Sequence, residues 1–257
     1  MAGEYIAEAF QEARVQPFGD SYFAPFAFTD SDSTQQIGVN VVGYVEGLSG
    51  SGHTIVLTAH YDHLGVRDGQ VYNGADDNAS GTAALLAIAR LVSAAPLGHT
   101  VIFAAVDAEE MGLQGARAFV REPPVLLSRI ALNVNLDMVS HSDSVLFVAG
   151  THHYPFLKPY LESIEPASPV VLRFGHDTPN LPSGDDWTLS SDHGPFHEAG
   201  IPFVYFGVED HPDYHQPTDD PPTINRAFYV AAVSTIVNVI TTLDANVDEI
   251  VARRATP

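Results

Sequence analysis

The stretch TVIFAAVDAEEMGLQG (residues 100–115) joins an apolar run to a turn that carries three acids. The run 100–106 predicts a buried strand, and Asp107, Glu109 and Glu110 follow it directly. Like charges repel one another, and burying a carboxylate is costly. Acidic side chains also suit the first turn of an exposed helix, so this segment alone leaves two interpretations open, an ordinary helix start and a functional site.

The same succession of apolar runs and helical segments continues through the chain. We expect strands at 39–45, 54–59, 100–106, 130–136, 145–149, 170–174 and 201–206, with helices notably at 81–95 and 115–121. Several of these strands are apolar throughout, which is typical of strands covered on both faces. The sequence therefore predicts an α/β protein, a three-layer α/β/α sandwich with a central mixed, mostly parallel sheet.

The two ends of the chain extend this pattern. We expect a helix at 3–13, a strand or extended arm at 22–28, and a closing helix at 228–243. The sequence contains no internal repeat, low-complexity tract or convincing linker. We therefore expect residues 1–257 to form one domain, on which the N-terminal helix and arm, residues 1–35, pack.

The composition restricts both the partners and the metal ligands. The chain has 11 Lys and Arg against 32 Asp and Glu, a formal net charge of -21 at pH 7. This charge argues against nucleic acid or an anionic membrane surface as a partner and favours cations or cationic substrates. Because there is no cysteine, histidine and carboxylate groups must hold any metal.

Neither a signal peptide nor a membrane span is expected in the chain. The N-terminus MAGEYIAEAF has acids where a signal peptide needs a basic end, and the longest apolar stretch, near 227–240, is predicted to be too short and too interrupted to span a bilayer. We expect a soluble protein without a membrane partner. Its expected localisation is extracellular or periplasmic if a leader has been removed, and cytoplasmic otherwise. The sequence does not indicate an oligomeric state.

The first candidate for metal binding is a histidine at the end of a predicted strand. In open α/β sheets, ligands bind beyond the carboxyl ends of the strands. His60 follows the run 54–59, and a single histidine there is most often part of the core. However, Asp62 lies two residues further on, and a nearby carboxylate is the usual partner that fixes the tautomer of a metal-binding histidine.

Three further motifs carry acids or a histidine close to predicted strands or helices. They are GADDNASG (74–81), NLDM (135–138) and DYHQPTD (213–219). A capped turn, with Asn78 or Ser80 at the N-cap, explains the glycines of the first motif but not its paired aspartates. Together with His60 and the acids after residue 106, these motifs predict a metal site at one edge of the sheet.

The combination of motifs resembles the zinc aminopeptidases of the M28 family, the co-catalytic dizinc type. The resemblance extends from about Val39 to about Asp220. It implies a metallo-exopeptidase, a hydrolase that acts on peptides with a free N-terminus. The motifs that carry it are, in order, HYDH, GADDNASG, AEEMGLQGARAF, NLDM, SDHGPF and YHQPTDD.

The resemblance implies a ligand set for two Zn²⁺ ions. His60 and Glu110 would hold one zinc, Asp137 and His215 would hold the other, and Asp77 would bridge both. A water that bridges the two metals would be the nucleophile.

The resemblance also implies roles for residues next to these ligands. Glu109 would be the general base, and Asp62 would orient His60. The peptide bond between Asp77 and Asn78 would be cis.

Some residues depart from the family pattern or have no role in it. Relatives often carry a tyrosine shortly before the SDH motif, where this chain has Trp187 and Thr188, so the group that stabilises the oxyanion is left open. Ser190, Ser191, Asp192 and His193 follow one another too closely to form a serine-type relay, and we take the last two as structural or as supports of a ligand. The remaining histidines expected at the surface are His152, His153, His176, His197 and His211.

Two other functions share parts of this pattern. A glutaminyl cyclase, an acyltransferase with a similar fold, typically uses one zinc, and the GADDNASG and YHQPTDD segments argue against it. A peptidase-like binding module would have lost metal ligands, whereas all five are present here. The preferred N-terminal residue is not predictable, because the loop that we expect to build its pocket, residues 175–190, has no inferable conformation.

Overall fold

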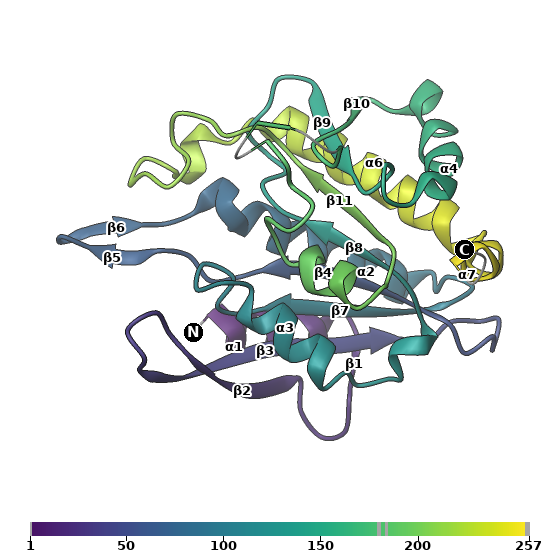
Figure 1. The fold of residues 1–257 in the computed structure, drawn as a ribbon, viewed down its shortest axis with the longest axis horizontal. Coiled ribbons are helices and arrows are strands. Elements are labelled where there is room, and N and C mark those ends of the chain that lie inside the picture. Colours follow the sequence, from purple (N-terminus) through teal and green to yellow (C-terminus); the bar gives the residue numbers. More distant parts are fainter. Residues whose placement is uncertain (1, 179–180, 183–184, 255–257) are drawn as a thin grey trace.

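A nine-stranded sheet forms the centre of the computed structural model, which describes residues 2–178, 181–182 and 185–254 (Figure 1). The strand order is β1-β3-β7-β4-β8-β11-β9-β10, and β2 pairs with the outer part of β3. The strands are β1 (Gln16–Pro17), β2 (Phe23–Thr29), β3 (Gln35–Val45), β4 (Thr54–His60), β7 (Thr100–Val106), β8 (Ile130–Leu136), β9 (Val145–Ala149), β10 (Val171–Phe174) and β11 (Phe203–Gly207).

Four neighbouring strands in the middle of the sheet, β7, β4, β8 and β11, run parallel. Strands β3 and β9 flank them in antiparallel orientation. The carboxyl ends of the four central strands therefore meet at one edge of the sheet. The mixed, mostly parallel sheet predicted from the sequence is confirmed.

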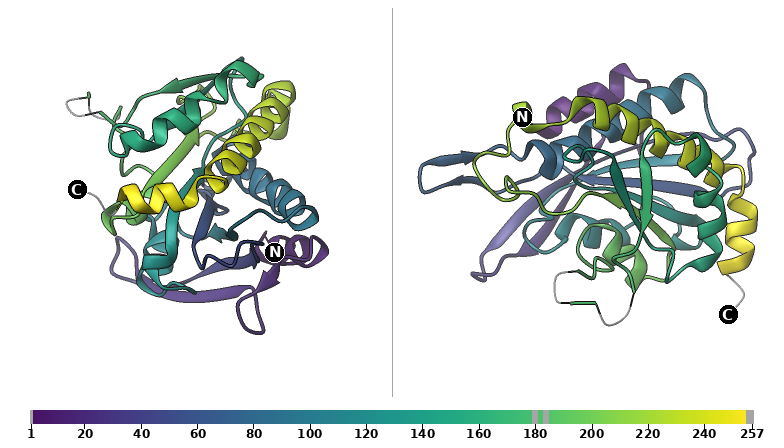
Figure 2. Two further views of the ribbon diagram at one scale, coloured as in Figure 1. Left: turned by 90° about the vertical axis from the view of Figure 1, so that its right-hand side faces the viewer. Right: turned by 90° about the horizontal axis from the view of Figure 1, so that it is seen from above.

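Helices cover both faces of the sheet (Figure 2). Alternate residues of one strand point to opposite faces. In β7, Val101, Phe103 and Ala105 belong to the core under α1, α2 and α6, whereas Ile102 and Ala104 pack with α3 and α5. The helices are α1 (Ala2–Glu12), α2 (Gly81–Ala94), α3 (Gln114–Arg121), α4 (Lys158–Glu162), α5 (His193–Glu198), α6 (Arg226–Asp244) and α7 (Val247–Arg254).

Several short elements were not predicted from the sequence. These are the two-stranded hairpin of β5 (Gly65–Arg67) and β6 (Gln70–Tyr72), and the helices α4, α5 and α7. Helices α4 and α5, with five and six residues, span too few turns to produce a clear apolar period. Helix α3, with eight residues, was predicted, whereas α7, of the same length, was not. Of the loop 175–190, residues 179–180 and 183–184 lie outside the described residues.

The prediction that the apolar stretch near 227–240 is too short to span a bilayer is wrong. Helix α6 has 19 residues and a mean hydropathy of 1.5, so by length and composition it is able to cross a membrane. Core helices of soluble proteins pass the same test. In this structure Phe228, Ala232 and Ile236 of α6 are buried in the main hydrophobic core.

Substitutions of two leucines test how much a buried side chain of the central strand β4 contributes to the stability of the protein. Leu57 of β4 is fully buried, and Leu48 in the preceding loop is 76% exposed. We expect Leu57→Ala to lower the free energy of unfolding by about 2–5 kcal/mol, because it removes apolar contacts and leaves a cavity. Leu48→Ala should change it by less than about 0.5 kcal/mol. Urea unfolding followed by circular dichroism measures both free energies. Equal losses of free energy in the two variants would show that Leu57 is not part of a tightly packed core.

Candidate metal centre

The central strands bring most of the predicted site residues to one edge of the sheet. His60 is the last residue of β4, Asp137 follows β8, and Glu109 and Glu110 follow β7. His215 lies in the loop after β11. These strands are neighbours and parallel, so their polar ends converge although they are far apart in the sequence.

Asp77 lies between two groups of these side chains. It belongs to the turn η1 (Ala75–Ser80), which leads into α2. Its Oδ1 is 3.3 Å from His60 Nε2, and its Oδ2 is 3.1 Å from His215 Nε2. The two oxygens of one carboxylate therefore face two different histidines.

The remaining acids divide between the two histidines. Asp137 Oδ1 is 3.3 Å from His60 Nε2, and Glu110 Oε2 is 3.5 Å from His215 Nε2. The pairing implied by the resemblance, His60 with Glu110 and Asp137 with His215, is therefore wrong. One group consists of His60, Asp77 and Asp137, and the other of His215, Asp77 and Glu110. Asp137 and Glu110 follow the strands on either side of β4, and Glu110 turns toward the loop of His215.

A further histidine belongs to the second group. His63 Nδ1 is 2.9 Å from Glu110 Oε1 and 3.8 Å from Asp77 Oδ2. The sequence contained this residue in the HYDH motif but gave it no role. Its signal was its position three residues after His60, on the same loop.

Asp62 contacts His60 through its backbone carbonyl group, whereas its carboxylate was expected to make this contact. The carbonyl oxygen of Asp62, rather than its carboxylate, lies 3.2 Å from His60 Nδ1, and the carboxylate is 3.7 Å away. With the proton on Nδ1, the lone pair of Nε2 faces Asp77 and Asp137. The Asp62 carboxylate accepts hydrogen bonds from the backbone amides of Glu109 and Glu110, at 3.0 and 3.2 Å, and so fixes the turn after β7.

A buried hydrogen-bond chain orients Asp137. Ser191 Oγ donates to Asp137 Oδ2 at 2.7 Å, and the Asn135 amide donates to Ser191 Oγ at 2.8 Å. This leaves Asp137 Oδ1 for His60. His193 Nε2 instead contacts the Trp187 carbonyl oxygen at 2.7 Å, and its Nδ1 lies 3.4 Å from the Asn135 amide nitrogen. Among the described residues no hydrogen bond joins Ser191 to His193, in agreement with the expectation that they form no serine relay.

Asp219 ties the turn η1 to the loop that carries His215. The Asp219 carboxylate is fully buried and accepts hydrogen bonds from the backbone amides of Asp76 and Asp77, at 3.0 to 3.1 Å. The peptide bond from Asp77 to Asn78 is cis, as the resemblance implies. The pair of aspartates in GADDNASG is thus held by an acid 142 residues away in the sequence.

Three residues of the site or next to it have left-handed backbone conformations. Ala108, Met138 and His215 have φ angles of 57°, 55° and 54°. Residues other than glycine rarely adopt such angles, and where they do the surroundings must enforce them, often at functional sites. Ala108 directly precedes Glu109, and Met138 directly follows Asp137.

The three acids of the opening stretch have three different surroundings. Asp107 accepts hydrogen bonds from the amides of Val39 and Ala108 and is structural. Glu110 contacts His63 and His215. Among the described residues the Glu109 carboxylate has no hydrogen bond or ion pair, although it lies close to His60 and Asp137.

Burial determines the acidity of Glu109. Burial, together with the carboxylates of Asp192, Asp137 and Glu110, raises the pKa of Glu109 well above its usual range, against the opposing effect of His60. A nearby dication would favour the ionised form and reverse this shift.

The donor set fits two zinc ions. Ligand atoms about 2.0–2.2 Å from a tetrahedral zinc lie roughly 3.4 Å apart, and the four contacts of the two groups measure 3.1 to 3.5 Å. Hydrogen bonds to Asp77 and Glu110 raise the pKa of His215 to about 10, so a proton compensates these acids without a metal. Metal binding would displace such protons and would therefore weaken as the pH falls.

Several other residues differ from their expected surroundings. Trp187 stacks on His176 at 3.7 Å, and Thr188 Oγ1 is 3.0 Å from His153 Nε2, so other side chains already engage both. Asp192 is fully buried, and neither carboxylate oxygen has a hydrogen-bond partner among the described residues. The prediction that His211 lies at the surface is wrong, because only 5% of its side chain is exposed.

Comparison with known structures shows a shared fold. A Zn-dependent exopeptidase from Parabacteroides distasonis ATCC 8503 has a TM-score of 0.74 and 19% identity, and the match covers 93% of this chain and 88% of that chain. The glutaminyl cyclase of Porphyromonas gingivalis also has a TM-score of 0.74, with 17% identity over the same shares of the two chains. The fold therefore does not separate the two activities.

Comparison with known sequences shows the family. Aminopeptidase YwaD of Bacillus subtilis (strain 168) is 34% identical over 200 residues, which cover 72% of this chain and 40% of YwaD. The chain spans less than half the length of this and the next most similar curated relatives. The model of peptidase family M28 matches residues 40–240, a range that includes every proposed metal ligand. The chain belongs to peptidase family M28.

Proposed function

We propose that this protein is a dizinc aminopeptidase that hydrolyses the first peptide bond of peptides with a free N-terminus. The observation that carries the proposal is the position of Asp77, whose two oxygens face His60 and His215 separately. A carboxylate in this position is able to bridge two metal ions. The name of its relative YwaD supports aminopeptidase activity.

The residues around the two groups would divide the work of hydrolysis. When bound, two zinc ions would act as Lewis acids on the peptide carbonyl group and lower the pKa of water to about 7. Glu109 would take a proton from the attacking water as the new C–O bond forms. The same carboxyl group would then give the proton to the nitrogen of the leaving amine as the C–N bond breaks.

The acidic site also suits the substrate. The free α-amine of a peptide is a cation near neutral pH, and the unpaired carboxyl group of Glu109 lies close to the proposed ligands His60 and Asp137. A cavity of about 370 Å³ adjoins Glu110 and is lined by Ile37, Leu64 and Met111, among others. It offers apolar surface next to the site for part of a peptide chain.

Glutaminyl cyclase activity is the alternative, because cyclases share the fold. That reaction typically uses one zinc. The second group, in which His215 Nε2 lies 3.1 Å from Asp77 Oδ2 and 3.5 Å from Glu110 Oε2, favours the dizinc peptidase.

The two glutamates test the proposed roles separately. We expect Glu109→Gln to lower turnover roughly 100- to 10,000-fold, since it removes the proton acceptor, while the zinc content and the KM stay close to those of the unaltered protein. Glu110→Gln should bind one zinc ion fewer, because a weak neutral amide replaces a charged ligand, and added zinc should restore part of its activity. Release of p-nitroaniline from aminoacyl anilides and metal analysis by mass spectrometry measure these effects.

Two results would contradict the proposed roles and activity. If Glu109→Gln loses zinc, or keeps near-normal turnover, Glu109 is not the base. If the unaltered protein releases no amine from any aminoacyl anilide but cyclises N-terminal glutamine, the cyclase reading holds instead.

Two neighbouring serines test the support of Asp137. Ser191 Oγ donates to Asp137 Oδ2, whereas the exposed Ser190 donates to the Trp187 carbonyl oxygen. We expect Ser191→Ala to weaken zinc affinity or activity about 10- to 100-fold, as is usual for groups that orient a metal ligand. Ser190→Ala is the matched control and should leave both unchanged. A competitive zinc chelator measures the affinity, and equal effects of the two substitutions would refute the role of Ser191.

A further inference from the structure

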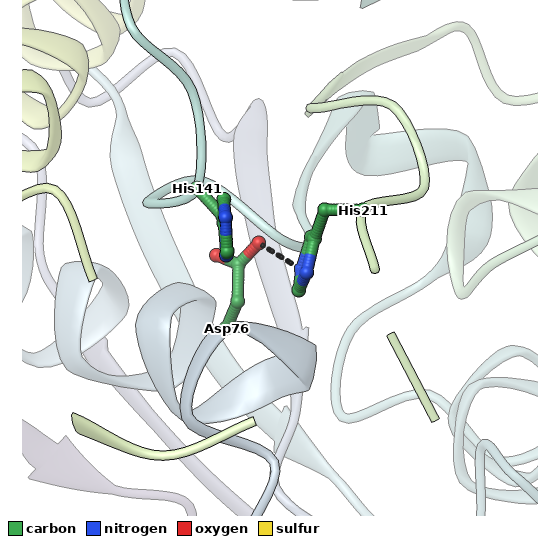
Figure 3. A group of neighbouring side chains, drawn as sticks. All are labelled: Asp76, His141 and His211. Carbon is green, nitrogen blue, oxygen red and sulfur yellow. Dashed lines mark hydrogen bonds and ion pairs between the residues drawn. The ribbon is translucent and has the colours of Figure 1, made fainter. Parts of the chain in front are cut away.

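A second cluster of possible metal ligands includes Asp76, the neighbour of Asp77 in the turn η1. Figure 3 shows the rings of His141 and His211 beside the carboxylate of Asp76. Asp76 is fully buried, and its Oδ1 accepts hydrogen bonds from the backbone amide and the hydroxyl of Ser140, at 2.8 and 2.7 Å. Its Oδ2 remains for the histidines and lies 3.1 Å from His211 Nε2.

The side chains of His141 and His211 pack against each other, and one ring nitrogen of each has no hydrogen-bond partner among the described residues. Their rings stack at 3.7 Å with an angle of 19° between the planes. Only 5% of the His211 side chain is exposed to solvent. The Nδ1 atoms of both residues are buried and have no hydrogen-bond partner among the described residues. Such polar atoms are rare in folded proteins and call for an explanation.

We propose that Asp76, His141 and His211 form a third divalent-metal site, separate from the pair of ions proposed above. One ligand atom from each residue lies within 4.8 Å of the other two, so small side-chain rotations bring all three to the 2.0–2.2 Å that zinc requires. Two imidazoles and one carboxylate favour zinc or a similar transition metal over Ca²⁺ and Mg²⁺, which prefer oxygen ligands alone.

The surroundings of the cluster favour a cation. A cavity of about 450 Å³ is lined by His141 and His211 together with the acids Asp143, Glu209 and Asp210. These carboxylates add negative potential, and the cavity has room for a fourth ligand such as water. The three protein ligands therefore leave one side of the ion open.

The position of the cluster gives the ion a structural role. Asp76 precedes the bridging residue Asp77, His141 follows Asp137 by four residues, and His211 precedes His215 by four. One ion would thus connect the turn η1 with the loops after β8 and β11. These are three of the segments that carry the proposed zinc ligands. The proposal of a third metal site does not require that the protein has peptidase activity.

The stoichiometry of zinc in histidine variants tests this site. His141→Ala and His211→Ala each remove one of its ligands, and His152→Ala removes an exposed histidine outside every cluster described above. Each protein is stripped of metal, dialysed to equilibrium against Zn²⁺ and examined by native mass spectrometry. We expect both cluster variants to bind one zinc ion fewer than the unaltered protein and His152→Ala to bind the same number.

A fourth variant separates this site from the catalytic pair. His215→Ala should also lose one ion, and the double variant His141→Ala/His215→Ala should lose two. The loss of one zinc ion in His141→Ala tests the third site whether the catalytic centre binds one ion or two. Failure of the dizinc proposal and failure of the third site therefore give different zinc counts.

One result overturns the proposal directly. If His141→Ala and His211→Ala bind as many zinc ions as the unaltered protein, Asp76 and His211 form a simple ion pair and no third site exists. His141 is only partly buried, and the hydrogen bonds between Asp76 and Ser140 do not involve it, so we expect His141→Ala to fold. This variant therefore tests the site even if His211→Ala fails to fold. Thermal unfolding with and without Zn²⁺ checks the fold, and an equal stabilisation of His141→Ala and the unaltered protein by zinc would also count against the site.

Discussion

The carboxylate of Asp77 is the contact on which the rest of the site depends. Its oxygens lie 3.3 and 3.1 Å from the nitrogens of His60 and His215, which come from opposite parts of the chain. Burial works against its charge, but hydrogen bonds from His215 and His60 outweigh burial and keep its pKa below the usual range. The turn that presents Asp77 is itself held by Asp219. A buried charge is tolerated here because each of its oxygens has a cationic or metal-binding partner.

The acids around the site fall into two physical classes. Asp62, Asp107 and Asp219 accept hydrogen bonds from backbone amides, and so they stabilise the loops at the sheet edge. Glu109 and Asp192 have no such partner, and burial raises the pKa of both. The structural acids are thus engaged by backbone amides, whereas the two unpartnered acids hold a proton more readily. Perturbed acids of this second kind are typical of catalytic sites.

The long apolar elements were predictable within one to four residues. Strand β7 occupies 100–106 in both the prediction and the structure, and helix α6 extends the predicted 228–243 by two residues at its start and one at its end. The short helices α4 and α5 were missed because five or six residues do not establish a period. The expected surface position of His211 failed for a different reason. Its partner Asp76 lies 135 residues away, and no local pattern reports such a contact.

By itself, the sequence determined the type of fold, the family resemblance and the set of donor groups, because apolar strands and the polar residues after them are local features. Only the tertiary structure decided how these donors pair. Asp137 joins His60, and Glu110 joins His215 and His63, because strand order and the left-handed conformations of Ala108, Met138 and His215 set the direction of each side chain. The cluster of Asp76, His141 and His211 likewise exists only where three loops meet. Such pairings depend on distances between segments remote in the chain, which spacing along one sequence does not contain.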